Sequence, residues 1–186
     1  MTIAGRRNGF SLIEILVVIV IIGIVSSVAL LSLGLLGDDR ELQTEARRLI
    51  SLVEVAQDEA VMQGRELGLE LMAHSYRFVE YNPFTNQWGD LVGDATFRMR
   101  QLPEDIELEL YLEGRNIMLE DEPADFDNPD MVGAAGPKET YTPHILVFSS
   151  GDITPFELHV LRSDSNQAVA LRGGLTGSLE LLTEDD

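Results

Sequence analysis

The hydrophobic positions of this chain follow three patterns in succession: an unbroken apolar run, a helical stripe and a set of alternating segments. The run covers residues 15–36, which include no Asp, Glu, Lys or Arg. A helix crosses the hydrocarbon core of a bilayer with about 20 apolar residues at about 1.5 Å rise each, and the run is longer than that. It therefore predicts a transmembrane helix, with Gly34 and Gly37 as points where the helix can bend.

The helical stripe begins beyond the apolar run. Apolar residues recur there at alternating spacings of four and three, which is the period of one helix face. Gly64 is a suitable C-terminal stop. The pattern predicts one helix that continues to Gln63 and packs this stripe against one face of a sheet. The residues of the stripe are Leu42, Ala46, Leu49, Val53, Ala56 and Ala60.

The alternating segments start at Leu67, where the hydrophobic period changes to two. Turns are expected at His74-Ser75 and at residues 164–166. A long helix followed by many short antiparallel strands indicates an α+β fold, with the helix packed on an antiparallel β-sheet or β-sandwich. The predicted strands cover residues 67–71, 76–81, 96–100, 106–112, 115–119, 144–148, 156–161, 167–172 and 179–182.

A single carboxylate, Glu14, lies at the start of the apolar run. The short segment before it contains Arg6 and Arg7, whereas Asp38 and Asp39 follow the run. Positive charge remains on the cytoplasmic side of a membrane, so the remaining domain is predicted to lie outside the cytoplasm. An ionised carboxylate at the membrane boundary is costly unless a cation meets it, which makes Glu14 a candidate functional residue.

Two simpler interpretations of the N-terminal segment leave Glu14 without a role. A secretory signal peptide has a shorter apolar stretch, and residues 26–29 are only a weak cleavage site. A plain single-pass anchor explains the apolar run alone.

The segment Gly9-Phe10-Ser11-Leu12-Ile13-Glu14, followed by the apolar run, resembles the class III leader of type IV pilins and type II secretion pseudopilins. The resemblance implies that a prepilin peptidase cuts between Gly9 and Phe10 and methylates the amine of Phe10. It also implies that Glu14 of an incoming subunit pairs with the Phe10 amine of a neighbour in the filament, so that both charges are neutralised. Capping of its own helix by Glu14, worth about 1 kcal/mol at most, stays open beside this role.

A second stretch, Phe148-Ser149-Ser150-Gly151-Asp152-Ile153-Thr154-Pro155-Phe156, is similar to the Phe-x-x-x-Gly-x-(Ile/Leu)-Thr stretch of the H-type minor pseudopilins, the GspH/FimT group. The two resemblances together imply a pilin-like layout. Residues 1–9 are the leader peptide, 10–36 the transmembrane helix, 37–64 its periplasmic amphipathic part and 65–186 a β-rich globular periplasmic domain.

The composition of the chain argues against some classes of function. The net charge is −19 at pH 7 and the chain has no cysteine. An acidic surface repels nucleic acid and anionic lipid headgroups, and loss of the leader would remove Arg6 and Arg7 and make the chain more acidic. Without cysteine there is neither a disulfide framework nor thiolate chemistry.

Residues 120–130 hold six acids, and calcium binding is the obvious hypothesis. An EF-hand needs a central glycine and a Glu at the twelfth position of its loop, and neither Asp121 nor Asp125 as a start satisfies this. An exposed, mobile loop is therefore expected. Phe84 and Trp88 lie in a stretch rich in Pro, Asn and Gly, where they either cover the local core or form a contact surface.

The histidines and one serine cluster are further candidates for chemistry. His74, His144 and His159 lack metal-ligand spacing, although His144 and His159 could meet across strands. Ser149, Ser150 and Asp152 occur without a Gly-x-Ser-x-Gly elbow, so a turn is expected there. No catalytic residue, metal or cofactor is predicted.

The chain is expected to be a structural subunit and not an enzyme. The resemblance implies a minor pseudopilin of the type II secretion pseudopilus, which drives export of folded proteins across the outer membrane. Its expected partners are prepilin peptidase, other minor and major pseudopilins and inner-membrane lipid, with no nucleic acid. It would span the inner membrane once, with its C-terminal domain in the periplasm.

Two alternatives remain open. A minor pilin of a type IV pilus, acting in assembly or DNA uptake, is the first, although DNA binding calls for a basic patch. A membrane-anchored periplasmic enzyme is the second, and it would need a cluster of titratable groups that the sequence does not display.

Overall fold

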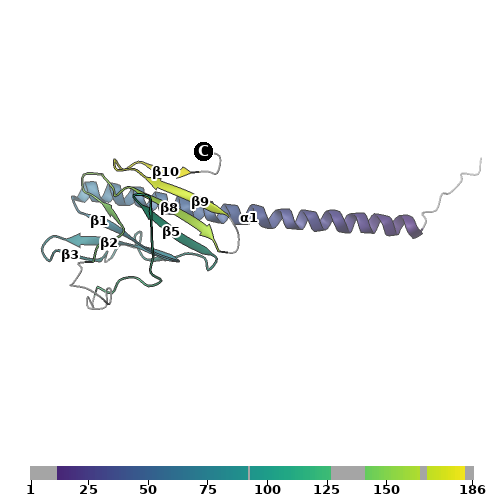
Figure 1. Cartoon of the computed structure of the whole chain (residues 1–186), viewed down its shortest axis with the longest axis horizontal. Helices are drawn as coiled ribbons and strands as arrows, with labels where there is room; N and C mark the ends of the chain where they lie inside the picture. Colours follow the sequence, from purple (N-terminus) through teal and green to yellow (C-terminus); the bar gives the residue numbers. More distant parts are fainter. Residues whose placement is uncertain (1–11, 92, 127–140, 164–166, 183–186) are drawn as a thin grey trace, which may run out of the picture. The chain divides into compact units, whose positions relative to one another are not determined.

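The computed structural model describes residues 12–91, 93–126, 141–163 and 167–182, and within the helix it describes the side chains of residues 12–26 and from Arg40 onward. The chain divides into two compact units, Met1–Arg40 and Glu41–Asp186. Figure 1 shows the helix in purple to blue and the strands in teal to yellow.

One helix, α1 (Leu12–Gln63), accounts for 52 residues and runs without interruption past Gly34 and Gly37. It ends where the sequence predicts. Gly64 adopts a φ of 64°, a left-handed conformation that glycine tolerates best. The amide of Arg65 then donates to the carbonyl of Ala60 at 3.1 Å, which is the backbone bond of a Schellman C-cap.

The predicted transmembrane segment, residues 10–36, begins outside the described residues. Within the part of the chain that the structure describes, no helix has both the length and the apolar character needed to cross a membrane.

The strands form two five-stranded sheets in which every pairing is antiparallel. Sheet A has the order β3-β2-β1-β7, with β4 also paired to β2, and sheet B has the order β10-β9-β8-β5-β6. The strands are β1 (Leu67–Met72), β2 (Ser75–Asn82), β3 (Gln87–Asp90), β4 (Arg100–Gln101), β5 (Ile106–Leu112), β6 (Arg115–Ile117), β7 (Ile145–Val147), β8 (Phe156–Arg162), β9 (Ala168–Gly173) and β10 (Leu179–Leu182).

Most predicted strands are confirmed, and the α+β class with them. The prediction for residues 96–100 is wrong, because strand pairing there is confined to Arg100–Gln101. Phe97 lies in a turn before β4, where its buried ring packs on Phe78 at 5.0 Å between centroids. The predicted turn at residues 164–166 lies outside the described residues, but the strands on either side of it, β8 and β9, do pair.

The sequence analysis missed β3 and placed the end of β6 too late. β3 forms a hairpin with β2 through a turn in which Asn86 has a φ of 55°, and its Trp88 ring lies 5.3 Å from the Tyr81 ring. The composition of this hairpin, rich in Asn, Gln and Gly, carries no alternating apolar signal. β6 stops at Ile117, two residues before the predicted end.

The core of the globular unit lies between α1 and the two sheets. The predicted helical stripe is buried, and Ala46, Ala56 and Ala60 are fully inaccessible. Their small side chains let the helix backbone approach the strands. The same cluster contains Leu69 of sheet A and Leu158 of sheet B, so the stripe packs against residues of both sheets.

Sheet A is covered on both faces, which explains why all of β1 is buried. Leu67, Leu69 and Leu71 belong to the core on one face. On the other face, a Cβ at Gly68 would overlap the ring of Pro143, so glycine is required there for close packing. Segments 118–126 and 141–144 lie over this second face and are held to it by the bonds described below.

Candidate functional site

The predicted processing site, Gly9 and Phe10, lies outside the described residues. Glu14 is in the first turn of α1, where it is the acidic residue nearest the helix N-terminus. The unpaired amides of a helix start carry positive charge, and a carboxylate there is stabilised by about 0.3–1 kcal/mol when exposed. The structure therefore brings Glu14 to a position that suits helix capping.

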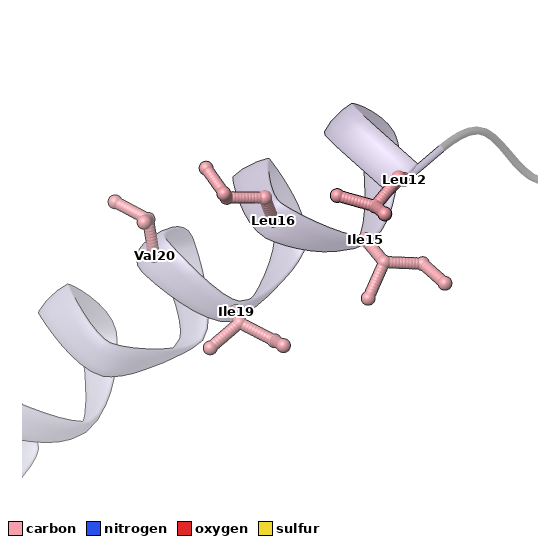
Figure 2. Close-up of a pocket in the computed structure, with 5 residues that line it drawn as sticks. All are labelled: Leu12, Ile15, Leu16, Ile19 and Val20. Atoms are coloured by element: carbon pink, nitrogen blue, oxygen red, sulfur yellow. The ribbon is translucent and has the colours of Figure 1, made fainter.

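Around Glu14 the helix surface is apolar. Figure 2 shows Leu12, Ile15, Leu16, Ile19 and Val20 along one side of α1. At about 100° per residue, Glu14 lies on roughly the opposite side from this strip. Every large apolar side chain of residues 12–25 is exposed, from 46% at Val18 to 84% at Leu12. A helix that is apolar on all sides is stable only inside a larger assembly or a membrane.

The three histidines have separate structural roles. His74 Nδ1 lies 3.0 Å from the carbonyl of Ile106. His144 Nδ1 accepts a hydrogen bond from the amide of Leu71 at 3.1 Å, and burial lowers the pKa of this imidazole, an effect that the nearby Glu70 opposes. His144 and His159 do not meet, because His144 precedes β7 of sheet A and His159 lies in β8 of sheet B.

His159 belongs to a polar cluster on the outer face of sheet B. Its Nε2 lies 2.8 Å from Glu157, and its ring lies 5.0 Å from that of Tyr111. Hydrogen bonds from His159 and then Arg172 lower the pKa of the Glu157 carboxyl. Among the described residues, no group of three or more His, Asp or Glu side chains is placed to hold a metal ion.

Ser149 and Ser150 lie in a turn between β7 and β8, as predicted. Gly151 has a φ of 91°, a conformation strained for other residues. The Glu66 carboxylate accepts two hydrogen bonds from Ser149, one from the backbone amide at 3.1 Å and one from the hydroxyl at 2.8 Å. Ser150 donates to Asp152 at 2.9 Å. These bonds make the serines part of a turn, with no histidine among the partners described.

Gln57 of α1 fixes this turn to the rest of the globular unit. Its Nε2 donates to the carbonyls of Gly151, at 3.4 Å, and Gly177, at 3.0 Å. Thr154 completes the arrangement, because its Oγ1 accepts from the amide of Leu146 at 3.0 Å. The glycine and threonine of the motif are thus explained by backbone conformation and bonding.

The described part of the acidic segment, residues 120–126, is mostly exposed, as expected, yet Arg77 ties it to sheet A. Arg77 lies 2.5 Å from Glu70, 3.0 Å from Asp90 and 2.5 Å from the carbonyl of Ala124. The amide of Ala124 donates to Glu70 at 2.9 Å. Residues 127–130 of the predicted acidic loop lie outside the described residues.

Aromatic rings close the polar cluster around Arg77. The Phe126 ring lies 4.4 Å from the Arg77 guanidinium carbon and 5.0 Å from the Tyr141 ring, edge to face. Burial, followed by the negative charge of Glu70, raises the pKa of the Tyr141 phenol. Phe84 differs from these rings, because it is 94% exposed.

A second buried arginine, Arg162 of β8, joins distant segments. It lies 3.0 Å from Glu41 of α1 and pairs closely with Asp105. The sequence analysis singled out neither this arginine nor Arg77. The role of these two arginines is visible only in the structure, because their bonding partners lie in other segments of the chain.

Comparison with known families divides the chain in the same way as its geometry. A motif described as the prokaryotic N-terminal methylation motif matches residues 5–36, within the first unit. The family described as Type II transport protein GspH matches residues 45–177, within the second unit. The chain belongs to the GspH family.

Curated relatives agree with this family over nearly the whole chain. A type II secretion system protein H of Pseudomonas aeruginosa is 36% identical over 88% of this chain and 89% of its own length. The protein of the same name from Aeromonas hydrophila is 30% identical over 97% of this chain and 96% of its own.

Solved structures of this family share the fold. The minor pseudopilin EpsH of the Vibrio cholerae type II secretion system matches with a TM-score of 0.59 at 21% identity, over 80% of this chain and 99% of that one. The solution structure of Escherichia coli GspH matches with a TM-score of 0.56 at 18% identity, over 80% of this chain and 92% of that one. The pilin-like architecture predicted from the sequence is confirmed.

These matches assign the GspH-family chain a minor pseudopilin role in type II secretion, as predicted, and favour it over a type IV pilus. The family is structural in function. The methylation motif implies processing by prepilin peptidase, anchoring in the inner membrane and assembly with other pseudopilins.

Proposed function

We propose that the chain is made as a precursor, cut between Gly9 and Phe10 and methylated on the new amine of Phe10. The mature protein then spans the inner membrane once, through residues 10–36, with residues 37–186 in the periplasm. The exposed apolar side chains of residues 12–25 support this proposal, because they require surroundings that exclude water.

Assembly into the pseudopilus is driven by a charge pair. Glu14 of an incoming subunit meets the Phe10 amine of a neighbour, and both charges are neutralised in an apolar environment. The supporting observation is that Glu14 lies within the first turn of a helix whose other large side chains, from Leu12 to Val25, are apolar and exposed. In an apolar environment a cation stabilises an ionised carboxylate, so pairing of Glu14 with the Phe10 amine favours docking and fixes the axial register.

The assembled filament moves folded proteins toward an outer-membrane channel, and the globular unit selects neighbours among the other pseudopilins. The chain has no catalytic task and does not bind nucleic acid. The strongly acidic composition, with 32 acidic against 13 basic residues, supports the second statement, since a DNA-binding surface concentrates positive charge.

Processing and assembly are tested separately. Mass spectrometry of the N-terminus, on full-length protein extracted from membranes, should find a methylated Phe10. The variant Glu14→Ala should show the same processed N-terminus, because the cleavage site is intact. It should nevertheless fail to co-purify with other pseudopilins after mild detergent extraction.

A matched control is Glu113→Ala, which removes an acid whose side chain is 82% exposed in the turn between β5 and β6. This variant should assemble normally. An unprocessed Met1 in the wild-type protein would overturn the processing step, and normal co-purification of Glu14→Ala would overturn the charge pair.

A further inference from the structure

Two segments, residues 118–126 and 141–144, lie over the face of sheet A that turns away from the core, and we call them the cover. The first segment is bonded to the sheet at Ala124. The amide of Ala124 donates to Glu70 at 2.9 Å, and its carbonyl accepts from Arg77 at 2.5 Å. The second segment is bonded to the sheet through an imidazole ring.

That ring belongs to His144, and it takes the place of a backbone partner in the sheet. The pairing of β1 with β7 runs from Leu67 to Leu69. Continued by two residues, this register would place Leu71 opposite Pro143, which has no N–H to donate. The Leu71 amide instead donates to His144 Nδ1 at 3.1 Å. The ladder between β1 and the cover therefore ends on a titratable side chain.

The bond at His144 requires a neutral ring. An imidazole nitrogen that accepts a hydrogen bond carries no proton, and protonation would turn Nδ1 into a donor that faces the Leu71 amide. His74 differs, because its Nδ1 lies 3.0 Å from the carbonyl of Ile106, which accepts from a protonated ring as well. His159 lies beside a carboxylate. Of the three histidines, His144 is thus the one whose hydrogen bond a proton breaks.

The charged and titratable groups around His144 come from three strands and from the cover. Glu70 of β1 favours a proton on His144, but Glu70 already pairs with Arg77 of β2, which also pairs with Asp90 of β3. Burial outweighs this attraction and lowers the pKa of His144. Burial and the charge of Glu70 raise the pKa of Tyr141 far above neutral, so this phenol keeps its proton.

Tyr141 also shows that the closed cover is incompletely bonded. Its phenol oxygen is buried and makes no hydrogen bond with any described residue. A buried hydroxyl without a partner costs free energy, and contact with water would remove that cost. Tyr141 therefore favours the open cover, and the bond at His144 is one of the contacts that oppose opening.

We propose that His144 is a pH-sensitive switch, and that protonation of its ring releases the cover from sheet A while α1 and the two sheets stay folded. The two segments move together because the Phe126 and Tyr141 rings pack edge to face at 5.0 Å. Opening exposes the surface at Gly68, where the side chain of Pro143 now lies close to the backbone. The core itself is apolar and has no comparable switch.

The direction of the effect follows from proton binding. In the open cover the pKa of His144 returns to about 6.5, whereas in the closed cover it is lower. Below pH 6.5 the open form therefore binds more protons, and opening increases as pH falls. The opening constant rises by at most about tenfold per pH unit, and it levels off below the pKa of the closed form.

Amide hydrogen exchange of the purified full chain in detergent tests this, with rates corrected for the intrinsic effect of pH on exchange. Between about pH 7.5 and about pH 5.5, protection of the Leu71 and Ala124 amides should fall about threefold or more. Ala124 is the decisive probe, because it lies in the other segment and does not bond to His144. The Leu158 amide of β8 should stay at least about tenfold better protected than both.

Three variants assign the effect to the ring. His144→Asn keeps an acceptor without the titration, so protection of Ala124 should no longer depend on pH. His144→Leu removes the acceptor at every pH, and protection of Ala124 should already fall about fivefold at about pH 7.5, the change that corresponds to one typical hydrogen bond. His159→Asn, on the outer face of sheet B, is the matched control and should respond to pH like the wild type.

A measurement on the wild type keeps the test independent of how the variants fold. The pH at which protection of Ala124 stops falling should equal the midpoint of the His144 ring titration, measured by NMR. The switch is wrong if protection of Ala124 is constant with pH, if His144→Asn responds like the wild type, or if Leu158 exchanges as fast as Ala124, since the last result means global unfolding. None of these measurements involves processing or assembly, so each outcome leaves the proposed function untouched.

Discussion

Two stretches of the same helix, residues 12–25 and residues 42–60, place similar apolar side chains in opposite environments. In the first stretch every large apolar side chain is exposed and Glu14 is the single charged residue. In the second, the stripe from Leu42 to Ala60 is buried against two sheets, and charged residues occupy the other faces. Helix propensity alone does not distinguish them.

The difference lies in where each stretch finds its partner. The second stretch finds it within the chain, because the strands that follow provide a matching apolar surface. The first stretch has no such surface among the described residues and depends on a membrane or on other subunits. Substitutions should therefore change folding in the second stretch and assembly in the first.

The largest effect on folding is expected at Arg77. Arg77→Ala leaves Glu70 buried without its cation, and the free energy of unfolding should fall by about 3–5 kcal/mol. Denaturant titration of the full chain in detergent measures this loss. Amide exchange of residues 120–126 should increase as well, because Ala124 loses its bond to Arg77. A decrease no larger than that of Arg115→Ala, at an exposed local pair, would contradict the role of this cluster.

A leucine truncated in each stretch sharpens the comparison directly. Leu49→Ala, at a side chain that is only 3% exposed, should lower the free energy of unfolding by about 3 kcal/mol, from lost burial and a residual cavity. Leu16→Ala, at a side chain that is 55% exposed, should leave unfolding of the globular unit unchanged. Equal losses in the two variants would show that both stretches pack in the same way.

Gln57 tests the polar attachment of α1. Gln57→Ala removes the donor to Gly151 and Gly177 and should lower the free energy of unfolding by about 1–2 kcal/mol. Exchange of the Gly151 amide should become faster. Gln63→Ala, at the exposed end of α1, serves as the control, and the prediction fails if both variants lose the same amount.

The smallest effect concerns pH. Burial lowers the pKa of His144 from 6.5, so between pH 6.5 and that lower value the unfolded chain binds more protons than the folded one. Stability should therefore decrease as pH falls through this window. His144→Asn keeps an acceptor for the Leu71 amide and removes the titration, so its unfolding midpoint should depend less steeply on pH below 6.5 than that of the wild type.

The sequence predicted those features that depend on local periodicity. The stripe from Leu42 to Ala60 and the alternation of β5 and β8 each repeat a regular spacing. Both elements could therefore be predicted from the sequence alone. The hairpin around Asn86 has no such repeat and was missed. The bonds of Arg77 to Ala124, and of Gln57 to Gly151 and Gly177, join segments distant in sequence, and no pattern in the chain indicates them.

The candidate site rests on a different kind of information. Gly9, Phe10 and Glu14 belong to one short segment within residues 5–36, which match the prokaryotic N-terminal methylation motif, so the hypothesis needs only local sequence. The roles of these three residues stay predictions.

Arg162 has a mechanical consequence. The Arg162 guanidinium, in β8 of sheet B, forms ion pairs with both Glu41 and Asp105. Glu41 is the first residue of the globular unit. Within the globular unit, a shift of α1 along its own axis relative to β8 would have to break the Glu41 pair in addition to the packing of the buried stripe. The start of this helical segment is therefore fixed by charge as well as by apolar contact.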